Sequence, residues 1–164
     1  MITVHGRTRC QFYKGTADWD AIRAVRERIS VPLVANGDCC TAEDAREMMR
    51  RSGADAVMIG RASYGRPWLA GQIGAELSGG PAVATPEGAG LADLVCEHIE
   101  AMLEHYGRDK GLKLARKHVA WYLDGVTPAM PASLRKAVLT SQDAAFVLST
   151  LRDWILQGGQ EAAA

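Results

Sequence analysis

Three short apolar segments of the chain each end at a glycine that stands beside polar or charged residues. The endings are His5-Gly6-Arg7, Asn36-Gly37-Asp38 and Gly60-Arg61. Glycine lets backbone N–H groups approach a ligand closely, and an arginine at such a turn can bind a phosphate through two hydrogen bonds. Gly37, Gly60 and Arg61 are therefore candidates for a phosphate site.

Each of these glycines also has a simpler explanation. Gly37 or Gly60, taken alone, is more readily explained as the residue that permits a tight turn between a strand and a helix. Ligands of parallel α/β folds bind at the carboxyl ends of the strands. Because the two glycines follow consecutive strands, together they favour a phosphate site.

Two basic stretches indicate an anionic partner. Arg7 and Arg9 follow His5 with no acidic residue close to them in the sequence, which predicts an anion-binding rim at this edge of the sheet. Residues 108–118 contain five lysines and arginines but a single acid, Asp109. The simpler explanation of such a run is a helix face exposed to solvent. The more specific alternative is a surface that binds nucleic acid.

The order of strands and helices in residues 1–77 predicts an α/β fold. Strands are expected at 2–5, 31–35 and 56–59, and helices at 17–29, 42–51 and 67–77. Short apolar strands that alternate with helices form parallel sheets with right-handed crossovers. The spacing of the strand ends resembles the roughly 31 residues per unit of a (β/α)8 barrel. We therefore expect three βα units of such a barrel.

Local signals set the predicted helix ends. Asp18 is placed to cap the first helix, and Thr41 with Asp44 forms a capping box before the second. Gly53 is expected to end that second helix.

The second part of the chain has a different pattern. Residues 78–90 are rich in glycine, proline and alanine, which predicts a linker. Residues 91–158 then show only helical periodicity and predict an all-α helical bundle domain, whose last helix should end at Gly158-Gly159. The expected helices are 91–106, 112–123, 133–138 and 141–155.

Composition excludes several classes of protein. The formal net charge is zero and 48% of residues are hydrophobic, as in soluble globular proteins. No apolar run approaches the roughly 20 residues that span a bilayer, and no signal peptide is recognisable. The four cysteines form no CxxC pair, and His98 and His105 have no third ligand. We therefore expect a cytoplasmic protein with reduced thiols, no membrane association and no metal site.

Several long motifs resemble a known family. The segments are TVHGRTRCQFYKGTADWDAI, VPLVANGDCCTAEDA, GADAVMIGRASYGRPW and ARKHVAWYLDG. In their order and intervals they are similar to the C-terminal half of tRNA-dihydrouridine synthases, above all to the bacterial subgroup related to the nitrogen-regulation protein NifR3. The resemblance covers essentially the whole chain.

The resemblance implies a fold and a reaction. Members of this family combine an FMN-containing (β/α)8 barrel with a helical tRNA-binding domain, and they reduce uridine in tRNA to 5,6-dihydrouridine with NADPH. Residues 1–77 would then be the last three βα units of the barrel and would bind FMN, and residues 91–158 would bind tRNA. The implied cofactor-binding residues are His5, Asn36, Gly37, Asp38, Gly60 and Arg61. The implied tRNA-binding residues are Arg7, Arg9, Lys113, Arg116, Lys117 and His118.

The chain also departs from the family pattern. The first barrel half, with the cysteine that donates a proton to the uracil, has no counterpart here, so we expect no catalytic residue in this chain and no activity of the chain alone. The expected partners are tRNA and the missing N-terminal barrel half, so the chain looks like a C-terminal fragment. Two other functions stay open: a different (β/α)8 barrel enzyme that binds a phosphorylated ligand, and a non-catalytic RNA-binding remnant.

Overall fold

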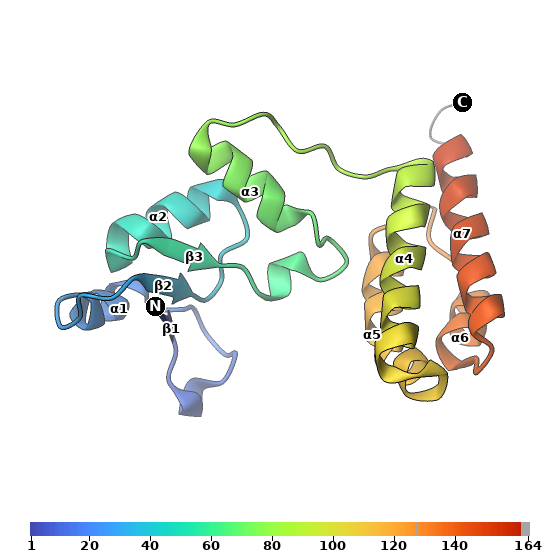
Figure 1. Ribbon diagram of the computed structural model, residues 1–164, viewed down its shortest axis with the longest axis horizontal. Coiled ribbons are helices and arrows are strands. Elements are labelled where there is room, and N and C mark those ends of the chain that lie inside the picture. Colours follow the sequence, from blue (N-terminus) through green and yellow to red (C-terminus); the bar gives the residue numbers. More distant parts are fainter. Residues whose placement is uncertain (127, 162–164) are drawn as a thin grey trace. The chain divides into compact units, whose positions relative to one another are not determined.

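A computed structural model describes residues 1–126 and 128–161 of the chain. These residues form two compact units, the first of residues 1–84 and the second of the described residues from Thr85 onward. The first unit contains all the strands of the described residues, and the second contains helices alone (Figure 1).

A three-stranded parallel sheet forms the centre of the first unit. Its strands are β1 (Ile2–His5), β2 (Leu33–Asn36) and β3 (Ala56–Met58), in the order β1-β2-β3. The predicted α/β fold with a parallel sheet is confirmed. β2 begins two residues later than predicted, directly after Pro32, which has no N–H group to donate but whose carbonyl accepts from the Ile2 N–H at 2.9 Å.

Three helices follow the strands in alternation: α1 (Trp19–Arg26), α2 (Ala42–Ser52) and α3 (Leu69–Ser78). The predicted caps are confirmed. The Asp18 carboxylate accepts a hydrogen bond from the Ala21 N–H at 3.0 Å, and Thr41 and Asp44 form the capping box before α2. Gly53 ends α2 with a φ of 68°, a left-handed conformation that glycine adopts without strain.

The helices cover one face of the sheet. Leu33 and Ala35 on β2 are fully buried, and they belong to a core with side chains of all three helices, including Ile22, Met48 and Ile73. The alternate residues of the strands point to the other face, where Met58 is 49% exposed. Among the described residues no helix covers this second face, and no strand pairs with the outer edges of β1 and β3.

Two short 3-10 helices lie in the loops at the carboxyl ends of the strands. The helix η1 (Arg9–Gln11) belongs to the loop after β1, and η2 (Arg61–Ser63) follows β3 directly.

The second unit is a bundle of four helices: α4 (Gly88–Tyr106), α5 (Arg108–Asp124), α6 (Ala132–Thr140) and α7 (Ala144–Glu161). The prediction that Gly158-Gly159 ends the last helix is wrong, because α7 continues to Glu161. Glycine lowers helix stability without forbidding the helical conformation. Similarly, α5 begins at Arg108 and not near Leu112, so Lys110 lies within the helix.

The bundle is held together by apolar side chains on the facing sides of α4, α5 and α7. Ile99, Ala115 and Leu151 are fully buried, one from each of these helices. On α5 this side is an apolar stripe of buried residues that includes Leu112, Val119 and Tyr122.

The backbones of α4 and α5 approach closely at Gly111. A Cβ atom at this position would lie 2.6 Å from the carbonyl oxygen of Met102 and 2.9 Å from the Cα of Leu103. Only a residue without a side chain fits there.

No helix of the described residues is both long and apolar enough to cross a membrane.

Candidate functional site

The three strand ends of the first unit open into one cavity. His5 is paired with Asn36, and Asn36 with Met58, so the strands reach the same edge of the sheet together. The cavity has a volume of about 430 Å³, within the usual range for small-molecule sites. It is lined by His5, Tyr13, Asn36, Gly37, Asp38, Cys39, Cys40, Gly60, Arg61, Ala62 and Tyr64. The structure thus brings all six sequence-predicted cofactor-binding residues into one cavity wall.

The turn after β2 is shaped by close packing around Gly37. Its φ is 126°, and a Cβ atom there would lie 2.7 Å from the Cβ of Ala17 and 3.1 Å from the ring of His5. The indole N–H of Trp19 donates to the Gly37 carbonyl at 2.8 Å. Gly37 is therefore required by packing and backbone conformation, whether or not a ligand is bound.

Gly60 has a different reason to be glycine. A Cβ atom at this position would meet nothing within 4 Å, so no neighbour in the described structure excludes a side chain. Both the hydroxyl and the backbone N–H of Ser63 donate to the Gly60 carbonyl, at 2.7 and 3.0 Å, which fixes the turn. The open space at Gly60 lets a ligand in the cavity approach the backbone.

Asp38 is the centre of the charge network in the cavity wall. Its carboxylate forms an ion pair with Arg7 and accepts a hydrogen bond from the Ala17 N–H at 2.8 Å. Arg61 lies farther away, with its Nη2 atom 3.3 Å from Asp38 Oδ1. Partial burial acts to raise the pKa of Asp38, but the bonds from Arg7 and Ala17 and the charges of the two arginines outweigh it and lower that pKa. The site therefore has two guanidinium groups around one carboxylate.

Arg7 does not lie on an exposed rim. Its side chain is 2% exposed, and its Nε and Nη2 atoms donate to the carbonyls of Lys14 and Gly15 at 3.2 and 2.7 Å. Although no acid is close to Arg7 in the sequence, the chain folds Asp38 against it. Its Nη1 atom is buried and finds no hydrogen-bond partner among the described residues.

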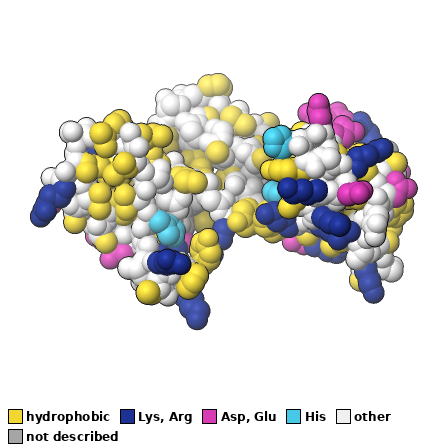
Figure 2. All heavy atoms as spheres, turned by 60° about the horizontal axis from the view of Figure 1, so that its bottom comes forward, with side chains coloured by type: hydrophobic (Ala, Val, Ile, Leu, Met, Phe, Trp, Pro, Cys, Tyr) yellow, Lys and Arg dark blue, Asp and Glu magenta, His cyan; other side chains and the backbone are white. Residues whose placement is uncertain are grey.

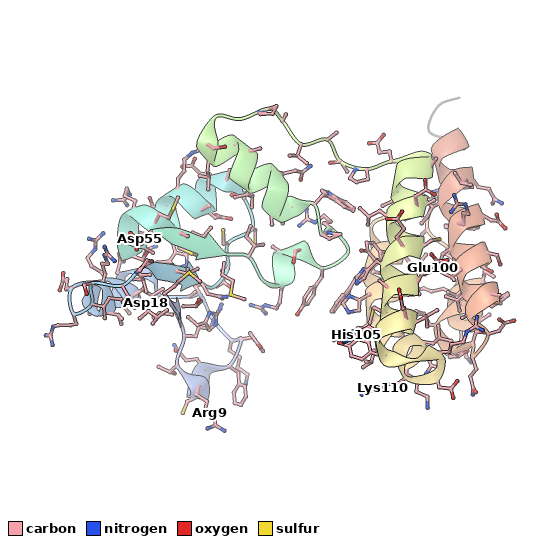
Figure 3. All side chains as sticks on the ribbon, in the orientation of Figure 1. Arg9, Asp18, Asp55, Glu100, His105 and Lys110 are labelled. Atoms are coloured by element: carbon pink, nitrogen blue, oxygen red, sulfur yellow. The ribbon has the colours of Figure 1, made fainter. Side chains whose placement is uncertain are left out.

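Tyr13 is a member of the cavity wall that the sequence interpretation missed. The Arg61 guanidinium lies 4.7 Å from the centre of the Tyr13 ring, a cation–π contact. Tyr13 and the neighbouring Phe12 are about two-thirds exposed, at 66% and 69%. The available sequence signal was an aromatic pair between the basic residues Arg9 and Lys14. Figure 3 shows Arg9 at the outer end of this loop.

The two adjacent cysteines differ in environment. Cys39 is 3% exposed, and burial, with smaller effects from Asp44 and Cys40, raises its pKa to about 11. It is a protonated core thiol at neutral pH. Cys40 is exposed and its backbone N–H donates to the Asp44 carboxylate at 3.0 Å.

Basic side chains gather on the second unit, where Figure 2 shows lysine or arginine beside histidine on one face. Lys113 and Lys117 on α5 are exposed, and Lys110 lies near the turn between α4 and α5 (Figure 3). Arg116 is half-buried, and its Nη2 atom lies 3.4 Å from each of two carbonyl oxygens at the end of α6. The exposed lysines are thus open to a partner, while Arg116 also contacts its own bundle.

His118 belongs to a ring cluster between α4 and α5. Its ring lies 5.0 Å from that of His98 and 5.1 Å from that of Trp121, and His98 Nδ1 lies 2.9 Å from the Tyr122 hydroxyl. Burial lowers the pKa of both histidines, and for His118 the charges of His98 and Lys117 act in the same direction. The described residues contain no group of three or more histidine, cysteine or acidic side chains that could hold a metal ion.

The sequence profile of one protein family, described as Dihydrouridine synthase (Dus), matches residues 1–156. The chain belongs to this family. The resemblance of its motifs to dihydrouridine synthases is therefore confirmed.

Individual members of the dihydrouridine synthase family agree with the profile. The chain is 49% identical to a probable tRNA-dihydrouridine synthase of Rhizobium leguminosarum over 99% of its own length and 50% of that relative. It is also 49% identical to a probable tRNA-dihydrouridine synthase of Rhodobacter capsulatus, over 93% of the chain and 46% of that relative. It is 42% identical to tRNA-dihydrouridine synthase B of Salmonella typhimurium, over 77% of the chain and 40% of the relative.

The chain spans about half the length of the curated relatives that it matches, and the matched part is their C-terminal half.

Proposed function

We propose that this chain supplies the FMN-phosphate site and the tRNA-binding helices of a tRNA-dihydrouridine synthase. The observation that carries the proposal is the single cavity that unites Asn36, Gly37, Gly60 and Arg61 in a chain of this family. In this proposal the enzyme reduces uridine in tRNA to 5,6-dihydrouridine in the cytoplasm, with NADPH as reductant.

The residues of the cavity fit a phosphate monoester. Arg7 and Arg61 together carry one more charge than Asp38 neutralises, so the wall retains a positive charge. The open backbone at Gly60 and the half-exposed Arg61 guanidinium face the same cavity. The phosphate would bind Arg61 and the backbone near Gly60, and Asn36, Asp38 and His5 would contact or lie near the rest of FMN.

The proposal assigns binding and orientation to this chain. Hydride chemistry would come from the bound flavin. We propose no catalytic residue within the chain and assign the proton donor to the N-terminal half, the part of the relatives that the chain does not match. The isolated chain is then expected to be inactive.

The proposed place of the sheet is in a (β/α)8 barrel. The three βα units have two unpaired sheet edges and one face without helices among the described residues. Parallel sheets are normally covered on both faces and closed or extended by further strands. Residues 1–77 would be the last three units of the barrel, and an N-terminal barrel half would pair with their free edges.

The proposed tRNA surface lies mainly on α5. Residues 91–158 would form the tRNA-binding domain, joined to the barrel part by the linker 78–90. Lys113 and Lys117 are exposed basic residues of this helix, with Arg116 between them and His118 directly after Lys117 in the sequence. Arg9 on the loop after β1 would be a further tRNA contact. The side chain of Arg7 is buried, so Arg7 would not touch the tRNA itself.

A flavin titration tests the proposal. The chain should bind FMN more tightly than riboflavin, which has the same ring but no phosphate, and FMN should show the altered absorption of a bound flavin. Inorganic phosphate should compete with FMN. Binding of sugar phosphates but of neither flavin would indicate a different barrel enzyme, and tRNA binding without flavin would indicate an RNA-binding remnant.

A further inference from the structure

Arg7 is a buried cation whose hydrogen bonds link two separate segments. Its guanidinium reaches the carbonyls of Lys14 and Gly15 in the loop after β1, and it pairs with Asp38 after β2. With a side chain 2% exposed, it does not line the cavity itself. Arg7 therefore acts on the cavity only through the residues it contacts.

Asp38 passes the effect of Arg7 on to the cavity. One of its carboxylate oxygens accepts bonds from Arg7 and from the Ala17 N–H, and the other lies 3.3 Å from Arg61 Nη2. Asp38 also has a φ of 61°, an uncommon conformation for a residue with a side chain. The two bonds to Oδ2 hold this conformation and fix the place of the carboxylate.

The two arginines share Asp38 unequally. Arg7 is buried and forms the closer ion pair, while Arg61 is 48% exposed and more distant from the carboxylate. Asp38 is thus neutralised largely by Arg7. The Arg61 guanidinium, steadied by the Tyr13 ring at 4.7 Å, keeps hydrogen-bonding capacity for a group in the cavity.

We propose that Arg7 is a positioning residue: without touching the ligand, it occupies Asp38 so that Arg61 stays available to an anion in the cavity, and it holds the loop of residues 8–16 against the strand ends. This inference rests on the proposed phosphate site and adds to it a residue that controls its strength. If Arg7 lost its charge, Asp38 would pair with Arg61 alone and compete with the anion for that guanidinium.

The test compares Arg7→Gln, Arg7→Lys and a matched control, Arg28→Gln, in the 164-residue chain. Arg28 is an exposed arginine of the same unit. The first measurement needs no ligand: hydrogen exchange of the Ala17 amide, which donates to Asp38. Exchange should become at least about tenfold faster in Arg7→Gln, the scale expected for loss of a charge-assisted contact, and stay unchanged in Arg28→Gln.

The second measurement is the ratio of the riboflavin and FMN dissociation constants. Arg7→Gln should lower this preference for FMN about tenfold while riboflavin affinity stays within about twofold, since Asp38 would then compete with the phosphate for Arg61 and riboflavin has no phosphate. Arg7→Lys keeps the charge and should retain most of the preference, although one ammonium group cannot replace the two-armed contact with the loop. A loss of affinity equal for both flavins would reduce Arg7 to a structural role and overturn the proposal.

Two outcomes separate this inference from the proposed function. If the wild-type chain binds neither flavin, the flavin assignment fails, and inorganic phosphate then replaces FMN as the probe for the same variants. If Arg7→Gln does not fold, Arg7→Lys decides: a preference lost as completely as in Arg61→Ala would contradict the role of the charge. Unchanged Ala17 exchange and unchanged phosphate affinity in folded Arg7→Gln would also overturn the proposal.

Discussion

The phosphate site depends most on Arg61, whose side chain is 48% exposed at the cavity wall. Its contacts with Asp38 and Tyr13 orient the guanidinium without using all of its donors. Charge-assisted hydrogen bonds to phosphate are stronger than neutral ones, but exposure to water weakens them.

We predict that Arg61→Ala weakens FMN binding about tenfold, the lower end of the range for a hydrogen bond to a charged group. Riboflavin binding should change little, because the lost partner is the phosphate. Fluorescence titrations of both flavins measure the two affinities, with Arg28→Ala as a control at an exposed arginine. Equal FMN affinity in wild type and Arg61→Ala would place the phosphate elsewhere.

Residues of the site could be predicted from the sequence where the signal was local. The polar glycine turns identified the cavity wall because each turn directly follows its own strand. The burial of Arg7 could not be predicted, since its partner Asp38 lies 31 residues away in the sequence. Tyr13 was missed for the same reason: its contact with Arg61 exists only once the loop after β1 folds toward the end of β3.

At the scale of helices and strands, the ends of helices could be predicted where the signal was local in the sequence. The caps at Asp18, Thr41 and Gly53 fixed the predicted helix ends within a few residues. Gly111 escaped prediction because its reason is the backbone of α4, which the sequence of α5 does not reveal. Substitution of Gly111 therefore tests directly how closely the backbones of α4 and α5 pack.

We predict that Gly111→Ala destabilises the helical unit by about 1–3 kcal/mol, because a methyl group there would overlap the Met102 carbonyl. Gly90→Ala is the matched control: it lies in α4 with nothing within 4 Å of the added carbon, so it should stabilise by about 0.5–1 kcal/mol. Urea unfolding measures both. Similar effects of the two substitutions would contradict the close crossing of α4 and α5.

The histidine cluster should make the stability of the bundle depend on pH. The pKa values of His98 and His118 are lowered below 6.5 in the folded state, so the unfolded chain binds protons more readily. The free energy of unfolding should therefore be highest above about pH 6.5 and fall as the pH drops through the folded pKa values.

Urea unfolding of wild type and of His98→Gln with His118→Gln between pH 7.5 and 5 tests this dependence. The double variant removes both titrating groups, so its stability should change less over this range. The slope with pH is the relevant quantity, because loss of the contact with Tyr122 also lowers stability at every pH. Identical slopes would show that the cluster is not linked to folding.

The basic face of α5 is the proposed tRNA contact. We predict that Lys113→Glu with Lys117→Glu weakens tRNA binding while the helical content stays unchanged, because both side chains are exposed. Their loss should also flatten the plot of log affinity against log salt by about 0.7–0.9 per phosphate contact. Filter binding at two or more salt concentrations measures both effects.

Circular dichroism controls for folding, and Lys136→Glu, at an exposed lysine of α6, is the control for single charge reversals. Lys113→Glu and Lys117→Glu should each weaken tRNA binding more than Lys136→Glu does. tRNA affinity that is insensitive to all these changes would leave α5 as a solvated surface.

At the scale of the whole molecule, the chain divides into an α/β unit and a helical unit, and it spans about half of the curated relatives that it matches. The composition change at residues 78–90 predicted where the pattern alters. In the proposed barrel, further strands and helices would pair with the sheet edges that are free among the described residues and would cover the second face of the sheet. They could be anticipated because three βα units cannot close on themselves.

In the function that we propose, this chain provides the flavin and tRNA sites of a tRNA-dihydrouridine synthase, and the proton donor lies in an N-terminal half. The direct measurement is dihydrouridine in unmodified tRNA, by mass spectrometry, after incubation with FMN and NADPH. We predict none with the isolated chain, and clear formation when the chain is fused to the unmatched N-terminal half of the Rhizobium relative. Dihydrouridine from the isolated chain, or none from a fusion that binds both FMN and tRNA, would contradict the account.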